Sequence, residues 1–313
     1  METFLTDFRG GVFELPVLTA WKFSYGAGLP CDAFEICFAY DKSMLSLLSE
    51  AVRFRAVFEG KTVFVGVVDE FEVRAGEKGC LASIRGRSLA ALLLDNEAEA
   101  AQYFSAGLDT ILERYVLPWG ISDIRKNASP RAQALVVASG SSCWRVLEDF
   151  LWFGCGVKPR FSREGVLLLG ETPGERLAID GSCAVFEAVL KEKRYGVISE
   201  ALVKNKALGT VNRVENAEFI QRGGHCRRVV NVPRNTRFDT MRSTGEYQIA
   251  RSREEEMMLS LSLPTLFGAF PGDVIQLSGT ALGLEGSFFV GRSCCFADGE
   301  GAGTEIILTR RVE

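Results

Sequence analysis

The stretch Phe64-Val65-Gly66 is followed by Phe71 and Gly76, and the same series returns as Phe289-Val290-Gly291, Phe296 and Gly301. In both places the phenylalanine stands five residues after the glycine of Phe-Val-Gly, and the next glycine stands ten residues after it. Each copy continues through a short polar segment, 77–79 or 302–304, into an apolar run that ends in arginine. Strand, glycine-bearing turn and return strand are the parts of a β-hairpin.

The spacing therefore predicts a duplicated hairpin, with six residues as a structural repeat: Gly66, Phe71, Gly76, Gly291, Phe296 and Gly301. Chance is the alternative, because the chain contains 32 glycines and 22 phenylalanines. Three matches at fixed offsets in similar surroundings favour duplication. If so, the chain carries two related β domains with unrelated material between them.

Length and composition describe a globular chain of several domains. Its 313 residues suggest two domains or three, and a hydrophobic share of 47% is sufficient for several cores. No run of 18 apolar residues occurs, so we expect no membrane-spanning helix. The N-terminus is acidic and lacks the basic start and apolar stretch of a signal peptide. We therefore expect synthesis and retention in a cytoplasm, or release from it by cell lysis.

The charge balance argues against general nucleic-acid binding, which requires a basic face. The formal net charge is −4. One local exception runs from Arg222 to Arg253, where eight arginines occur. Solvated loops with surface ion pairs explain such a run, and a contact with a partner is the functional alternative.

The first 87 residues predict β structure. Residues 34–40 and 52–58 alternate between apolar and polar side chains, which is typical of half-buried strands. Runs at 63–68 and 81–84 complete the first hairpin. Several short strands separated by turns favour a sandwich or a small barrel. The aromatic side chains near the N-terminus are expected to form its core rather than a base-stacking platform: Phe4, Phe8, Phe13, Trp21, Phe23 and Tyr25.

The pattern changes at Ser88, which can cap a helix over 89–95 that continues to residue 101. Further helices are predicted at 108–116 and from Ser141-Ser142 to Gly154, with short strands at 134–138 and 166–169. Residues 88–178 thus predict a compact α/β insertion. From about residue 179 the pattern is again β, with a polar helix at 244–256.

No group of residues predicts a catalytic, cofactor or metal site. His225 is the one histidine, and neither a Gly-x-Ser-x-Gly elbow nor a phosphate-binding loop accompanies it. His225-Cys226 is half of a zinc site at best, since none of the nine cysteines forms a Cys-x-x-Cys pair. The acidic pairs Glu148-Asp149 and Glu254-Glu255-Glu256 fit solvated faces better than a buried acid–base pair.

Short motifs occur in a characteristic order: Val63–Asp69, Ile84-Arg85-Gly86-Arg87-Ser88, Thr110–Tyr115, Pro271-Gly272-Asp273-Val274, Gly286–Val290 and Thr304–Leu308. In this order the chain resembles the baseplate hub proteins of contractile-tailed phages and related injection machines. That family includes the late-control protein D and the Mu-type hub proteins. The resemblance covers most of the chain.

The resemblance implies a mainly β fold with an α/β insertion. Two tail-tube-type β-barrels, residues 1–87 and 179–313, would flank a middle α/β domain, residues 88–178. The second barrel would carry an inserted arginine-rich excursion at about 205–256. The implied protein is not an enzyme and has no cofactor.

The resemblance also implies an assembly. Three copies would supply six barrels and join the six-fold tail tube above to a three-fold spike below. The partners would be the chain itself, as a homotrimer, the tail-tube protein and the central spike protein, with tape-measure and other baseplate proteins as further candidates. The location would be the bacterial host cytoplasm during assembly and then the tail baseplate of the virion.

Two other classes of function stay open at this point. One is a cell-wall hydrolase of the tail tip, which a muralytic assay would detect. The other is a small β-barrel module that binds a ligand or nucleic acid, which the net charge of −4 disfavours. Salt-dependent retention on DNA would test it.

Overall fold

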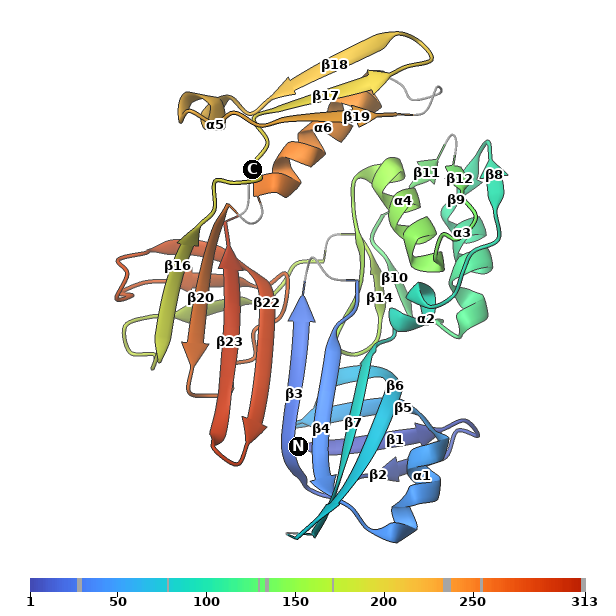
Figure 1. The fold of residues 1–313 in the computed structure, drawn as a ribbon, viewed down its shortest axis with the longest axis vertical. Helices are drawn as coiled ribbons and strands as arrows, with labels where there is room; N and C mark the ends of the chain where they lie inside the picture. Colours follow the sequence, from blue (N-terminus) through green and yellow to red (C-terminus); the bar gives the residue numbers. More distant parts are fainter. Residues whose placement is uncertain are drawn as a thin grey trace. The chain divides into compact units, whose positions relative to one another are not determined.

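The computed structural model describes residues 1–26, 30–77, 79–128, 130–132, 135–170, 172–232, 238–253 and 256–310. Strands make up 48% and helices 19% of the described structure, so the predicted mainly β class is confirmed (Figure 1). No helix in the described part is long and apolar enough to cross a membrane. The sequence Gly26-Ala27-Gly28 predicts a turn, and of its residues only Gly26 lies in the described part.

The first β segment forms one antiparallel sheet in the order β3-β4-β7-β6-β5-β1-β2. A short 3-10 turn and helix α1 connect β4 to β5. The elements are β1 (Glu2–Asp7), β2 (Val12–Glu14), β3 (Leu18–Gly26), β4 (Ala33–Ala39), η1 (Lys42–Met44), α1 (Leu45–Glu50), β5 (Ala51–Phe58), β6 (Lys61–Gly76) and β7 (Gly79–Ser88).

This sheet curls around a single core. Phe34 of β4 stacks on Phe54 of β5 with ring centroids 4.1 Å apart, although β7 and β6 lie between these two strands in the sheet. Phe23 of β3 and Phe64 of β6 meet in the same way at 5.5 Å. Aromatic rings bury large areas and account for much of such a core. Within the described residues the sheet is open, so a closed barrel is not seen.

The second β segment forms strands in the order β16-β20-β23-β22-β21-β15, of which the first four are labelled in Figure 1. Its buried side chains include Leu261 of β20, Ile275 of β21, Phe288 of β22 and Ile306 of β23. The strands are β15 (Arg176–Ile179), β16 (Glu187–Glu192), β20 (Met257–Leu263), β21 (Val274–Leu277), β22 (Gly286–Asp298) and β23 (Gly301–Thr309).

The two segments share one strand order. Taken along the chain, β1, β3, β4, β5, β6 and β7 take the same places in their sheet as β15, β16, β20, β21, β22 and β23 take in theirs. One strand differs in direction, because β1 is antiparallel to β5 whereas β15 is parallel to β21. The common order agrees with the predicted pair of related β domains, whose boundaries at 87/88 and 178/179 stay a prediction.

Strand β22 also pairs with β3 of the first segment. Six residue pairs run antiparallel, from Arg292 opposite Gly26 to Ala297 opposite Trp21. The chain divides into two compact units, Met1–Gly174 with Leu263–Gly272 and Gly291–Glu305, and Glu175–Ser262 with Asp273–Val290 and Ile306–Glu313. Strands β22 and β23 thus contribute to both units, and the pairing with β3 lies entirely within the first.

The middle segment packs small sheets and helices around its own core. Leu112 of α3, Leu147 and Phe150 of α4 and Leu167 of β14 are all buried in it. Its elements are α2 (Ala91–Leu94), β8 (Ala101–Tyr103), β9 (Ala106–Gly107), α3 (Leu108–Tyr115), η2 (Leu117–Trp119), β10 (Ile124–Lys126), β11 (Arg131–Ala132), β12 (Leu135–Val137), α4 (Cys143–Cys155), β13 (Pro159–Phe161) and β14 (Leu167–Leu169).

Two local predictions for this segment are wrong and one is confirmed. Ser88 ends β7 and its hydroxyl accepts a hydrogen bond from the Asp32 N–H, so it does not cap α2. The helix does not reach residue 101, because Ala101–Tyr103 pairs with β12 as a strand. Ser142 does cap α4, accepting from the Arg145 N–H at 3.2 Å.

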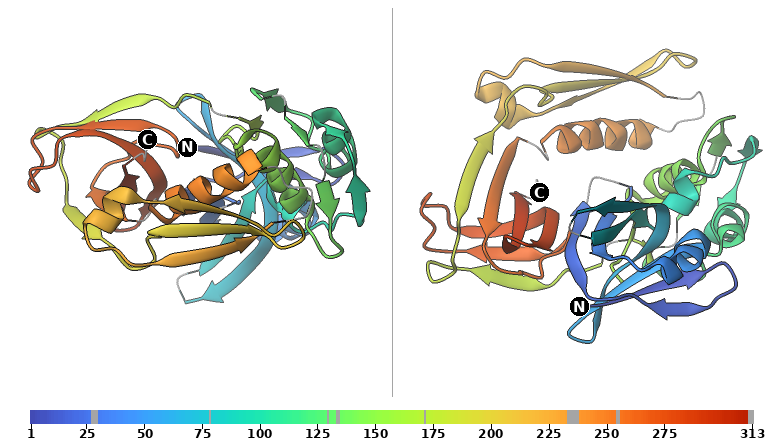
Figure 2. Two further views of the ribbon diagram at one scale, coloured as in Figure 1. Left: turned by 90° about the horizontal axis from the view of Figure 1, so that it is seen from above. Right: turned by 60° about the horizontal axis from the view of Figure 1, so that its bottom comes forward.

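The arginine-rich excursion is a folded unit rather than a set of loops. Strand β17 (Glu200–Asn205) lies between β18 (Thr210–Glu215) and β19 (Arg227–Asn231). Helix α5 (Ala217–Gln221) follows β18, and α6 (Phe238–Arg253), longer than the predicted 244–256, packs across the sheet (Figure 2). Ala201 and Ile249 are buried between the sheet and α6.

Candidate functional site

The sequence repeat lies on the hairpins β6–β7 and β22–β23, which occupy corresponding places in the two sheets. In β6 the residues that face the core are even-numbered in the first part of the strand and odd-numbered in the second. Phe64 and Gly66 are buried, and then a register shift between Val68 and Glu70 moves the core face to the odd-numbered residues. A β-bulge has this effect, since it inserts one residue into a strand of period two.

Gly66 is required by a close approach of the neighbouring strand. A Cβ atom at this position would overlap the carbonyl oxygen of Arg87 and lie 2.8 Å from the Phe64 ring. Gly86 on the partner strand is confined in the same way by the carbonyl oxygen of Val67 and by the Phe34 ring. The two glycines let β6 and β7 come together where the bulge occurs.

Phe71 and Phe296 are both half-buried. Phe71 lies opposite Ile84 and packs against the first core, as expected for a core-facing residue just beyond the bulge. Phe296 lies opposite Lys22, whose side chain is exposed, and its ring lies against Gly303. The two phenylalanines therefore face different sides of their strands.

The two hairpins also turn at different points of the repeat. The first turn follows Gly76, and Gly76 lies opposite Gly79. The second turn is Gly299-Glu300, where the Asp298 carboxylate accepts from the backbone N–H groups of Glu300 and Gly301. The turn predicted at 302–304 is wrong, because those residues belong to β23. Gly301, at φ +150°, begins the return strand.

Burial and register align β6 with β22 one residue away from the alignment that the sequence repeat gives. Phe64 and Phe288 are buried at the same point of their strands, and they lie opposite Ala56 and Ile275, which are also buried. This match places Cys295 at the position of Phe71. The predicted superposition of Gly66 on Gly291 and of Phe71 on Phe296 stays a prediction.

The outer face of the first sheet carries a network of ion pairs. Arg85 contacts Glu35 at 2.8 Å and Glu70 at 3.2 Å, and Arg87 contacts both Asp69 and Asp95 at 2.7 Å. These side chains come from β4, β6, β7 and the residues after α2. Exposed pairs of this kind contribute little to stability individually. They fix the charge pattern of this face.

Two strand edges have no partner strand among the described residues. β16 pairs only with β20, so its other edge is free, and its six residues are half-buried or exposed. In β6 the pairing with β5 stops at Val67, so residues 68–76 pair only with β7. Unpaired edges present rows of N–H and C=O groups that can pair with another chain. The edge strand Glu187–Glu192 lacks clean alternation of apolar and polar residues, so its sequence does not predict it.

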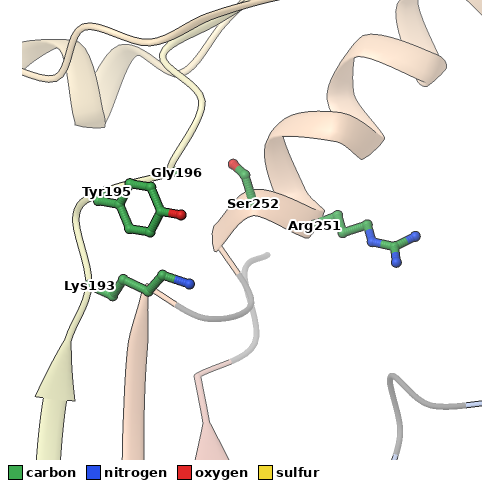
Figure 3. A pocket seen from close by; sticks show the side chains of 5 residues that line it. All are labelled: Lys193, Tyr195, Gly196, Arg251 and Ser252. Atoms are coloured by element: carbon green, nitrogen blue, oxygen red, sulfur yellow. The ribbon is translucent and has the colours of Figure 1, made fainter.

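A small hollow of about 150 Å³ lies beside the excursion, between the segment after β16 and the C-terminal end of α6 (Figure 3). Lys193, Tyr195, Gly196, Arg251 and Ser252 line it, and the Lys193 ammonium lies 5.2 Å from the centre of the Tyr195 ring. The Ser252 hydroxyl accepts from the Ile198 N–H and donates to the Ile249 carbonyl. This hollow is smaller than an ordinary ligand pocket.

The described acidic residues and the histidine that were considered for chemistry lie in ion pairs or in a loop. His225 is exposed in the turn before β19. Glu148 and Asp149 on α4 both contact Arg145, at 3.5 and 2.8 Å, and burial raises the pKa of Asp149. Glu254 and Glu255 lie outside the described residues.

Glu256 is buried rather than solvated, and it contacts Arg222 at 2.9 Å and Arg253 at 3.3 Å. In the described part of the chain, no three His, Cys, Asp or Glu side chains lie close enough to hold a metal ion. The candidate functional surface in the described part of the chain is the pair of strand edges on β6 and β16.

Comparison with solved structures identifies the architecture. A tail protein from Neisseria meningitidis MC58 superposes with a TM-score of 0.81 at 17% identity, covering 99% of this chain and 96% of that one. A 43 kDa tail protein of prophage MuSo2 from Shewanella oneidensis gives 0.75 at 17% identity, covering 99% and 98%. This chain has the fold of phage tail proteins.

The fold extends to injection systems. A component of the E. coli type VI secretion system, described as structurally similar to the T4 bacteriophage tail proteins gp27 and gp5, superposes with a TM-score of 0.59 at 13% identity over 95% of this chain and 74% of that one. At these identities the likeness shows a shared fold. No protein-family model and no curated protein sequence matches the chain.

Proposed function

We propose that this chain is the structural baseplate hub of a phage tail or a related contractile injection machine. Three copies form a ring that joins the six-fold tail tube to the three-fold spike. The tail-tube protein and the central spike protein are its neighbours in the assembly, and tape-measure and other baseplate proteins are further candidates. The chain acts in the bacterial cytoplasm during assembly and in the baseplate of the finished particle.

The observation that carries this proposal is the same strand order found twice in one chain. Two sheets of one architecture, joined through β22 and β3, give each chain two similar contact units. Three such chains would offer six units to a six-fold tube and three identical surfaces to a three-fold spike. The fold shared with tail proteins supports this reading.

The role is structural rather than enzymatic. Of the side chains considered for chemistry, Glu148, Asp149 and Glu256 are paired with arginines, and His225 lies exposed in a turn. Purified protein is expected to release no fragments from peptidoglycan. A muralytic activity that the wild-type fold shows and the His225→Ala variant lacks would favour a tail-tip hydrolase instead.

The test of the hub role is the position and copy number of the chain in assembled particles. A C-terminal tag, labelled and imaged by electron microscopy, is expected at the junction of tube and spike. Mass measurement of the hub with its spike is expected to give three copies of this chain. A label along the whole tube, or six equivalent copies, would contradict the proposal. Salt-dependent DNA retention by the isolated chain would favour a nucleic-acid-binding module.

A further inference from the structure

The arginine-rich excursion stands in the place of a hairpin turn. In the shared strand order β3 and β4 correspond to β16 and β20, and the first pair is connected by residues 27–32 alone. Between β16 and β20 the chain instead forms a module with its own sheet, helices and core. The ends of the module stay at hairpin distance, because Glu192 lies opposite Met257 and the Lys193 N–H donates to the Glu256 carbonyl at 2.7 Å. The excursion is therefore a module inserted at the end of one strand pair.

The chain enters this module through a short exposed crossing, residues 194–196. Tyr195 is 83% exposed, and Gly196 has a φ of +91° with nothing within 4 Å of a Cβ atom built there. Burial begins directly afterwards, at Val197 and Ile198, and Ile198 packs in the core of the module. A few loop residues that include an uncrowded glycine can absorb a large change of φ and ψ. The crossing is thus the point about which the module can turn.

The hollow of about 150 Å³ borders this crossing. Lys193, Tyr195 and Gly196 line one side of it, and Arg251 and Ser252 of the last turn of α6 line the other (Figure 3). The hollow separates the crossing from the helix, so the module can tilt there without displacing closely packed side chains.

A run of four ion pairs connects the module to the strand pair. Arg222, which follows α5, contacts Glu192 of β16 at 2.7 Å and Glu256, just before β20, at 2.9 Å. Arg253 at the end of α6 contacts Glu256 at 3.3 Å and Glu218 of α5 at 2.7 Å. We call these five residues the latch. They join both helices of the module to the ends of β16 and β20.

Solvent reaches the outer part of the latch. The side chains of Arg222 and Glu192 are 42% and 45% exposed, whereas that of Glu256 is 10% exposed. Salt and competing charged groups weaken exposed ion pairs much more than buried ones. Arg222 is shared between the two carboxylates on the strand side, so its release breaks two of the connections at once.

We propose that the excursion is a hinged module, which the latch holds against the ends of β16 and β20 and which turns about residues 194–196 when the latch opens. A charged group that competes for Arg222 shifts the module from the latched to the open position, because it binds only the open one. The hinge goes beyond the hub role, since it concerns a motion within one chain and does not depend on copy number.

Hydrogen exchange in the full-length protein, read by mass spectrometry, tests the hinge. Raising NaCl from about 0.1 M to about 1 M is expected to speed exchange at the Lys193 amide several-fold, because screening opens the latch. Arg222→Gln is expected to give the same change at low salt, and Glu192→Gln a smaller one. The matched control is Arg242→Gln, which removes an exposed ion pair with Glu246 inside α6 and should leave the Lys193 amide unchanged.

The amides of β17 and β18 distinguish opening from unfolding. A module that turns as a rigid body keeps their protection, so their exchange is expected to stay at the wild-type rate. Exchange in β17 and β18 that rises with that of Lys193 would show that the latch maintains the fold of the module, and would overturn the hinge. Unchanged exchange at Lys193 at high salt and in Glu192→Gln would overturn it as well, even if circular dichroism shows that Arg222→Gln does not fold. The hub role is tested separately, by the copy number in assembled particles, and can fail while the hinge stands.

Discussion

The Cα atom of Gly66 in β6 packs directly against the backbone carbonyl of Arg87 in β7. A Cβ atom added to Gly66 would overlap that oxygen, and the obstruction is backbone rather than a movable side chain. The contact lies next to the register shift between Val68 and Glu70. A residue chosen from a sequence repeat is thus also a position where only glycine fits.

Replacing Gly66 by alanine is expected to lower the free energy of unfolding by about 1–3 kcal/mol, because the strands must separate to admit the methyl group. Gly76 is the matched control, since nothing lies within 4 Å of a Cβ built there. Urea denaturation measures both. Equal effects of Gly66→Ala and Gly76→Ala would show that the close approach does not matter.

The sequence repeat found the two hairpins but not their register. A bulge adds one residue to a strand and moves every later side chain to the other face, and nothing in the spacing of Phe71 and Phe296 reveals it. Phe8 and Phe13 show a second limit. Both were expected in the core but are 61% and 42% exposed, because the β1–β2 hairpin forms the edge of the sheet.

Long-range pairing was also beyond prediction from the sequence. Alternation in 34–40 and 52–58 identified single strands, whereas the joint of β22 with β3 links residues about 270 positions apart. The arginine run predicts solvated side chains with surface ion pairs, and Arg227 agrees, because its side chain is 62% exposed and pairs with Glu200. The sequence of the run does not reveal that this partner, which lies outside the run, is buried.

Phe71→Ala and Phe296→Ala are each expected to lower the free energy of unfolding by about 1–2 kcal/mol, because half-burial retains part of the value of a fully buried ring. Phe71 packs on the first core, and Phe296 covers Gly303. Phe8→Ala, at an exposed position, is the control and is expected to be near neutral. Thermal and urea melts compare the three, and a neutral Phe71→Ala would contradict its place in the core.

Glu200→Gln is expected to cost about 1–3 kcal/mol of folding stability, because it leaves two guanidinium groups without their buried counter-charge. The Glu200 side chain is 10% exposed and contacts Arg213 at 2.5 Å and Arg227 at 2.7 Å. Glu246→Gln removes an exposed helical pair with Arg242 and should change stability by less than about 0.5 kcal/mol. Hydrogen exchange in β17–β19 localises the effect. Equal losses in the two variants would contradict a special role for Glu200.

Asp32 is expected to make the stability of the first unit fall as pH rises from about 4 to 6. Burial raises the pKa of its carboxyl from 3.8 to about 6, against the opposing effects of the Gly26 N–H and of Arg160. Between these values the unfolded chain ionises while the folded one stays protonated, so the folded state loses up to about 3 kcal/mol relative to the unfolded state. Below pH 4 both states are protonated and the effect vanishes.

Asp32→Asn removes the titration and keeps an oxygen that can accept from Gly26. Its stability relative to the wild type should therefore increase between pH 4 and pH 7. Asp41→Asn is the control of opposite sign, because hydrogen bonds from Ser43 lower the pKa of that exposed carboxyl. Urea denaturation at several pH values measures both variants. A difference between Asp32→Asn and the wild type that does not change with pH would mean that Asp32 is solvated in the folded protein.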